Sequence, residues 1–287
     1  MRSIAVLNQK GGVGKTTTSV NLSAALAAAG NRVCLIDLDP QAHASLHLGV
    51  TPGQEEKSIY DVLLSDVSLA AARRQVSENL WLVGSHIDLA AAEVELAGVI
   101  GREVILRDKL ADETNQPSSE LAPTIELQAA SPFDFLLIDC PPSLGILTLN
   151  ALAAVDEVLL PLQPHFLALH GLSKLMQTVD LVSRRLNSRL KLTGVVLCQY
   201  ESATRLAGEV ARDVADFFDS QRAKPTPWSN ARIFQTRIRR NIRLAEAPSF
   251  GQSILQYAPD SNGAEDYRAL CEELVSASAG ELVAKSA

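Results

Sequence analysis

The sequence predicts a doubly wound α/β fold, in which helices cover both faces of a single, mostly parallel β-sheet. The first observation is a set of short apolar runs, most of which lack the polar–apolar alternation of a half-exposed strand. The second is that helical stretches separate these runs, which is typical of doubly wound sheets. The third is composition: 287 residues with 47% hydrophobic and 21% charged residues are ordinary for a soluble α/β protein.

The expected elements alternate along the whole chain. Strands are predicted at residues 4–7, 32–37, 80–83, 133–139, 157–162 and 192–198. Helices are predicted at residues 15–29, 89–110, 144–153, 169–186 and 206–218, with a last helix from about 263 into the 270s. We expect one domain over residues 1–287. Residues 111–131 are polar and carry two prolines, which favours a surface insertion, and residues 280–287 are expected to be a disordered tail.

Charge and cysteine content narrow the class of protein. The net charge of -7 argues on average against a nucleic-acid binder, although an average hides local patches. The cysteines lack metal-ligand spacing and mostly lie in apolar stretches, so buried, reduced thiols in a cytoplasmic protein are expected; they are Cys34, Cys140, Cys198 and Cys271. No signal peptide is expected, and no apolar run reaches the roughly 20 residues that span a bilayer.

The glycine-rich stretch "NQKGGVGKTT" has the features of a phosphate-binding loop. It lies between a predicted strand and a predicted helix, and Gly11, Gly12 and Gly14 let backbone N–H groups turn toward a phosphate. Lys15 is expected to reach the β- and γ-phosphates, and the Thr16 hydroxyl to bind Mg²⁺. A ligand-free turn is disfavoured, because Gly-Lys-Thr-Thr stands in the strand–helix frame that phosphate binding requires.

Aspartates follow two of the predicted strands. Asp139 ends the apolar run "LLID" beside the loop, which is where a second acid on the Mg²⁺ side belongs. Asp37 and Asp39 end "LIDLD". One of them is a candidate for orienting a water on the γ-phosphate, and a turn cap before Pro40 is an equally good interpretation from the residues alone.

Four motifs in order, "KGGVGKTTT", "DLDPQA", "IDCPPSLG" and "RLAEAPSFG", resemble the ParA/Soj branch of the ParA/MinD ATPases over nearly the whole chain. This resemblance implies ATP and Mg²⁺ as cofactors and two monomers that sandwich two nucleotides. It implies that Lys10 crosses to the ATP of the other subunit and that Gly11 takes over the turn, which makes Gln9 tolerable. It also assigns the attacking water to Asp39 and leaves Asp37 a structural role. The implied nucleotide-binding set is Lys10, Gly11, Gly12, Val13, Gly14, Lys15, Thr16 and Thr17, with Lys10, Lys15 and Asp39 catalytic and Thr16 and Asp139 on the metal.

Three positions depart from the family pattern. Arg239 stands where relatives have a proline near the expected adenine edge, so the base contacts are not predicted. His170 replaces a glutamate, and Ala203 replaces an arginine.

A basic stretch covers residues 220–245, which contain no Asp or Glu. Its cations are Arg222, Lys224, Arg232, Arg237, Arg239, Arg240 and Arg243. One interpretation is a solvated face paired with nearby acids. The other is a surface that contacts DNA phosphates without reading bases. The resemblance favours the second, since such ATPases bind nonspecific DNA as ATP dimers, and it indicates Arg240 and Arg243, with Arg205 and Arg237 beside them.

The expected function is therefore a nucleoid-associated ATPase that partitions a chromosome or plasmid and is stimulated by a ParB-like partner. One alternative is a MinD-like or other ATPase that positions a protein assembly, although the tail "ELVSASAGELVAKSA" argues against a membrane anchor. Another is a metal-cluster assembly ATPase, which would need CxxC spacing. A third is a P-loop enzyme acting on a small molecule, resembling nitrogenase reductase or a synthetase.

Overall fold

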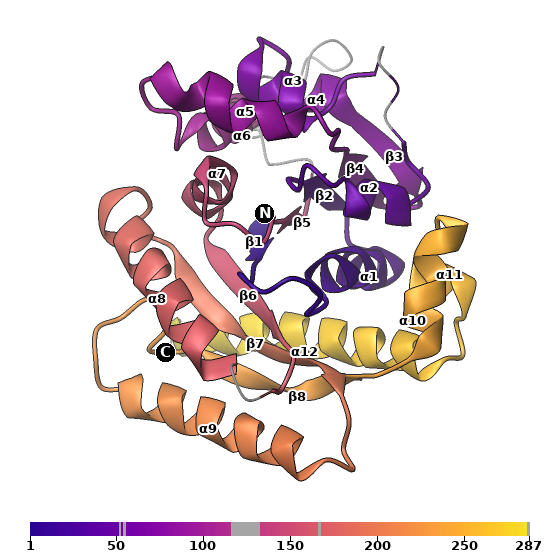
Figure 1. Ribbon diagram of the computed structural model, residues 1–287, viewed down its shortest axis with the longest axis vertical. Coiled ribbons are helices and arrows are strands. Elements are labelled where there is room, and N and C mark those ends of the chain that lie inside the picture. The colour runs from indigo at the N-terminus through magenta and orange to yellow at the C-terminus, as the bar shows by residue number, and fades with distance from the viewer. Residues whose placement is uncertain (52, 54–55, 116–132, 166–167, 286–287) are drawn as a thin grey trace.

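A computed structural model describes residues 1–51, 53, 56–115, 133–165 and 168–285. They contain one eight-stranded sheet in the order β3-β4-β2-β5-β1-β6-β7-β8 (Figure 1). The strands are β1 (Arg2–Val6), β2 (Val33–Asp37), β3 (Arg73–Ser77), β4 (Leu80–Val83), β5 (Phe135–Asp139), β6 (Glu157–Leu162), β7 (Lys191–Tyr200) and β8 (Arg232–Arg239). Only the β3–β4 pair among these strands is antiparallel. The carboxyl ends of the other strands therefore meet at one edge.

Helices cover both faces of this sheet. They are α1 (Lys15–Ala28), α2 (His43–His47), α3 (Ile59–Leu64), α4 (Leu69–Ala72), α5 (Leu89–Glu95), α6 (Ile105–Asn115), α7 (Ile146–Ala154), α8 (Ala168–Arg185), α9 (Arg205–Gln221), α10 (Ile242–Glu246), α11 (Ile254–Tyr257) and α12 (Asn262–Lys285), with 3-10 turns η1 (Leu96–Gly98) and η2 (Ala247–Phe250). One hydrophobic cluster joins α3 to α9 to one face, and a second joins α1, α2 and α10 to α12 to the other. The predicted doubly wound fold is confirmed.

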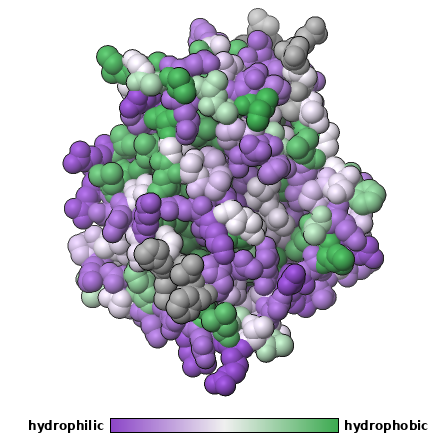
Figure 2. All heavy atoms as spheres, viewed as in Figure 1, coloured by the Kyte–Doolittle hydropathy of each residue, from purple (hydrophilic) through white to green (hydrophobic). Residues whose placement is uncertain are grey.

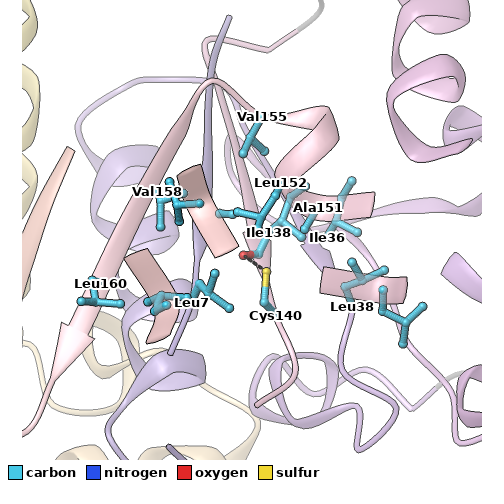
Figure 3. Packing of buried hydrophobic residues seen from close by; sticks show 14 of the residues in the cluster. Leu7, Ile36, Leu38, Ile138, Cys140, Ala151, Leu152, Val155, Val158 and Leu160 are labelled. Carbon is cyan, nitrogen blue, oxygen red and sulfur yellow. Dashed lines mark hydrogen bonds between the residues drawn. The ribbon is translucent and has the colours of Figure 1, made fainter. Parts of the chain in front are cut away.

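Alternate residues of each central strand supply the two clusters. In β5, Leu136 and Ile138 face the first cluster, and Phe135 and Leu137 face the second. Strands buried on both faces need apolar residues at every position, which is why these runs show no alternation. Figure 3 shows α7 packed over the ends of β1, β2, β5 and β6, with Cys140 in the middle of that contact.

The predicted interior strands are confirmed with small shifts of their ends, but both edge strands were missed. β3 and β8 carry exposed polar side chains because each has a neighbour on only one side. The sequence "RIFQTRIR" of β8 was interpreted only as part of a basic stretch. A search for continuous apolar runs detects buried strands and overlooks such edges.

Two helical predictions need correction. The single helix expected at residues 89–110 is wrong, since α5 and η1 end near Gly101, which has a φ of 75°, before α6 begins. α12 continues to Lys285, into the segment predicted as a disordered tail. Of the insertion expected at 111–131, residues 111–115 end α6, and the rest lies outside the described residues.

The surface is predominantly hydrophilic on the face seen in Figure 2, where hydrophobic side chains form small groups interrupted by hydrophilic ones. Within the described parts of the chain, no helix has both the length and the apolar character needed to cross a membrane. All four cysteines are buried and free, as expected.

Candidate functional site

The loop between β1 and α1 has a backbone suited to anion binding. Gly12 (φ 75°) and Gly14 (φ 94°) lie in the left-handed region that favours glycine. Gly14 is the N-cap of α1, and no side chain caps that end, so the first N–H groups of the helix stay available. The positive φ angles are at Gly12 and Gly14, and that Gly11 takes over the turn stays a prediction.

The loop also holds a donor without a partner. The side-chain Nε2 of Gln9 is buried and has no hydrogen-bond partner in the described structure. Val13 is buried beneath the loop, and the Thr17 carbonyl accepts a hydrogen bond from Asn21 within α1. The uncapped N–H groups at the start of α1 need acceptors, which a bound phosphate supplies.

Lys15 is the first residue of α1, and its side chain folds back along the loop. Its Nζ donates to the Lys10 carbonyl oxygen at 3.3 Å. Burial lowers the pKa of the Lys15 ammonium, while the carboxyl groups of Asp139 and Asp39 act in the opposite direction. A cation that has already lost its water shell interacts strongly with an anion placed beside it.

Asp139 ends β5 directly below the start of α1. Its carboxylate accepts hydrogen bonds from the Thr16 hydroxyl and the Ser19 hydroxyl, both at 2.8 Å. Complete burial, and then the nearby Asp37, raise the pKa of Asp139 to about 7. Hydroxyl and carboxylate oxygens are the ligands that Mg²⁺ prefers. Sequence reasoning missed Ser19, whose spacing of three residues from Thr16 places both hydroxyls on one side of the helix.

Asp37 pairs with Asp139 in the β2–β5 register and is fully buried. Its carboxylate accepts hydrogen bonds from the Ser45 hydroxyl at 2.7 Å and from the backbone N–H groups of Ser45 and Asp39. Burial raises the pKa of Asp37 to about 6. These bonds hold the turn after β2 in place, so Asp37 has a structural role.

Asp39 lies two residues further on, at the same edge of the sheet. It is 8% exposed, and its Oδ1 accepts a hydrogen bond from the Gln41 N–H at 3.0 Å. Its carbonyl oxygen accepts a bond from the Ser85 hydroxyl at 2.7 Å, which ties the turn to the segment after β4. Asp39 is also close enough to Lys15 to influence the lysine pKa. The carboxylate is therefore held beside the loop in a fixed turn.

The Lys10 side chain is exposed and reaches the segment after β6. Its Nζ lies 2.6 Å from Nε2 of His165, which follows β6, and its backbone N–H donates to the Asn8 side chain. Asn8 in turn donates to the Pro161 carbonyl, which anchors the start of the loop to β6. Burial and the Lys10 charge lower the pKa of His165. No motif in the sequence singled out His165.

Arg237 and Arg240 contact the residues at the end of β7. The Arg237 guanidinium lies 4.4 Å from the Tyr200 ring centroid and donates to the Tyr200 hydroxyl at 2.6 Å. Arg240 forms a 2.8 Å ion pair with Glu201, in which the arginine side chain is 76% exposed. Arg237 lies near the carboxyl end of β8 and Arg240 directly follows that strand, so both lie toward the same edge of the sheet as the loop.

Arg205 and Arg243 stand at the starts of two helices beside them. Arg205 is exposed at the first position of α9. Arg243 lies in α10 and pairs with Glu246 at 2.9 Å, with 55% of its side chain exposed. Arg243 is three residues after Arg240, and Arg205 is four residues after Glu201, so the four predicted arginines lie close in the chain to the carboxyl ends of β7 and β8.

The family departures have different structural contexts. Arg239 binds Asp266 and Glu265 of α12, and its backbone N–H also donates to Asp266 at 2.8 Å. This arginine therefore holds the end of β8 to α12. Ala203 lies in the turn before α9. The side chain of His170 lies outside what the structure describes.

Comparison with known proteins places this site in a family. A family model described as "AAA domain" matches residues 1–192. The chain is 42% identical to "Sporulation initiation inhibitor protein Soj" of Bacillus subtilis over 94% of this chain and 97% of that protein. It is 42% identical to "Chromosome partitioning protein ParA" of Myxococcus xanthus over 96% and 88% of the two chains. The chain belongs to the ParA/Soj family of P-loop ATPases.

A solved structure with the same fold carries a different title. It is "Cobyrinic Acid a,c-diamide synthase from Mycobacterium smegmatis with bound ATP analog and Magnesium", with a TM-score of 0.75 and 35% identity. The match covers 96% of this chain and 94% of that one. The ParA/Soj family therefore shares its fold with a nucleotide-bound protein named for small-molecule chemistry.

The position of Lys15 generates the first prediction. We expect Lys15→Ala to lose a charge-assisted phosphate contact worth on the order of 2–3 kcal/mol, and so to bind ATP at least tenfold more weakly. Isothermal calorimetry with Mg·ATP measures this. Lys174→Ala, on α8, is the control because it removes the same charge away from the loop. ATP affinity equal to wild type in Lys15→Ala would exclude this role.

Proposed function

We propose that this protein is an ATP-dependent, DNA-binding ATPase that partitions a chromosome or plasmid at the nucleoid. The observation that supports this proposal is that the phosphate loop follows β1, while the predicted DNA-contacting arginines lie close in the chain to the carboxyl ends of β7 and β8, at the same edge of the parallel sheet. An edge that holds both sites can connect nucleotide state to DNA affinity.

ATP and Mg²⁺ fit the residues at this edge. The loop offers uncapped N–H groups and the partly desolvated Lys15 ammonium to an anion. Thr16 and Asp139 would hold Mg²⁺, which when bound neutralises charge on the β- and γ-phosphates. Ser19 keeps the Asp139 carboxylate oriented through its second oxygen. The titles of related structures with an ATP analogue and magnesium support this assignment.

Hydrolysis in this proposal depends on Asp39. Its turn is fixed by bonds to Gln41 and Ser85, so its carboxylate can orient a water without moving the loop. The Lys10 side chain is exposed and its Nζ lies beside His165, which suits a side chain that neutralises phosphate charge on a second copy of the chain. ATP would thereby favour a dimer, and hydrolysis would release it.

The arginines are proposed to bind DNA phosphates in the ATP dimer. Arg205 supports this role, because a cation in the first turn of a helix is disfavoured by the helix dipole unless an anion approaches. The ion pairs of Arg240 and Arg243 are exposed and are therefore weak competitors for a polyanion. Two copies double the patch and multiply its affinity. A ParB-like centromere-binding partner would stimulate hydrolysis and reverse this state.

Small-molecule synthesis is the second candidate, because the Mycobacterium smegmatis structure bears a synthase name. That chemistry would require an acceptor substrate bound beside the γ-phosphate. It predicts ATP turnover that rises with an added carboxylic acid and ammonia donor. The partition proposal predicts turnover that rises with DNA and a ParB-like protein. Measuring ATPase rates with each addition separates the two candidates.

Asp39 and Lys10 are expected to affect different steps. Asp39→Ala should bind ATP and dimerise but lose nearly all hydrolysis, because only the water is misplaced. Lys10→Ala should bind ATP as a monomer, because its phosphate partner lies on the other subunit. Size-exclusion chromatography with ATP and a phosphate-release assay measure both effects. If Lys10→Ala dimerises as well as wild type, Lys10 is a ligand within its own subunit.

Arg243 allows a matched test of DNA binding. Arg243→Glu should lose most DNA affinity for any sequence while keeping the ATP dimer. Arg222→Glu is the control, because Arg222 also forms an exposed i,i+3 pair, with Asp219 at 2.8 Å, but lies at the far end of α9. A filter-binding titration reports both affinities. If the two variants lost equal DNA affinity, the loss would come from the change in net charge, and a local contact between Arg243 and DNA would be contradicted.

A further inference from the structure

The end of β7 contacts both the phosphate loop and two of the predicted DNA-contacting arginines, Arg237 and Arg240. The side chain of Gln199 donates a hydrogen bond from Nε2 to the Gly12 carbonyl oxygen at 2.7 Å. The preceding residue, Cys198, packs beside Gly14, where a Cβ would make an ordinary van der Waals contact with the cysteine Cβ at 3.5 Å. The loop therefore rests on the last residues of β7.

Gln199 adopts a backbone conformation that costs free energy. Its φ of 51° lies in the left-handed region, although it is not a glycine and belongs to a strand. The β7–β8 register shifts between Leu197 and Tyr200, which is where this residue lies. Strained residues persist where the surroundings hold them, and they concentrate at functional sites. Here the bond to Gly12 is the contact that the conformation makes.

The next two residues hold the arginines. Tyr200 binds the Arg237 guanidinium through its ring and its hydroxyl, and its carbonyl oxygen accepts the Arg240 N–H at 3.3 Å. Glu201 pairs with the Arg240 side chain. A displacement of Gln199 is thus transmitted through one or two peptide units to both arginines.

We propose that Gln199 is a positioning residue that couples the phosphate loop to the DNA-contacting arginines. With the Gly12 carbonyl held by Gln199, the loop N–H groups stay directed at the phosphate, and Tyr200 stays placed under Arg237. The bond contributes to coupling only if it is stronger when ATP and DNA are both bound than when either is bound alone, because a coupling free energy is a difference between states. This inference rests on the proposed function, since it concerns ATP-dependent DNA binding.

The test compares variants that remove the donor in two ways. Gln199→Gly accepts a φ of 51° without strain, so the fold is expected to persist, whereas Gln199→Met keeps the side-chain length and the strain but cannot donate. The readout is the ratio of DNA dissociation constants with ADP and with a nonhydrolysable ATP analogue. We expect both variants to lower this ratio by about fivefold, which is the factor that one hydrogen bond contributes. Gln235→Met, on the exposed side of β8, should leave it unchanged.

Two further measurements separate coupling from simple support of the loop. Affinity for the analogue without DNA should stay within about twofold of wild type, and by reciprocity the tightening of the analogue by DNA should shrink by the same factor as the ratio. Unchanged ratios in both variants would overturn the inference. The inference would also be overturned if the variants lost affinity for the ATP analogue by the same factor as the ratio of DNA dissociation constants. A wild-type ratio of one would instead refute the proposed function, and the coupling with it.

Discussion

The buried carboxylate of Asp139 is the group on which the site depends. Two hydroxyls of α1, from Thr16 and Ser19, donate to its two oxygens, so the first turn of the helix cannot move independently of β5. β5 in turn pairs with both β1 and β2, which carry the loop and the Asp37–Asp39 turn. The parallel arrangement brings these carboxyl ends together, and the hydrogen bonds of Asp139 fix their relative positions.

This arrangement carries a cost in the absence of counter-charge. Asp37 and Asp139 lie side by side with no exposed surface, and burial raises the pKa of each carboxyl group. Burial shifts Lys15 in the opposite direction, because it lowers the pKa of the ammonium group. These carboxyl and ammonium groups are shielded from water and lie close to other charged groups. Buried charges with shifted pKa values are typical of a preorganised binding site and are rare in a hydrophobic core.

The sequence predicted the interior of the sheet and the loop because both depend on local patterns. Apolar runs such as "VCLID" must be buried on both faces, and Gly-Lys-Thr-Thr stands at a strand–helix junction. The edge strands β3 and β8 lack that pattern. Ser19, His165 and Gln199 were missed because their partners are more than 100 residues away, at Asp139, Lys10 and Gly12. The sequence did not predict that Gly12 and Gly14 adopt positive φ angles, because no residue pattern specifies φ.

We propose that nucleotide state controls the contacts that Arg205, Arg237, Arg240 and Arg243 make with DNA phosphates. The direct measurement is a titration of wild-type protein with duplex DNA of two unrelated sequences, at two salt concentrations, with ADP and with a nonhydrolysable ATP analogue. The account predicts much tighter binding with the analogue, similar affinity for both sequences, and a steeper salt dependence from the doubled set of phosphate contacts. Equal affinity with both nucleotides, or binding that salt does not weaken, would contradict it.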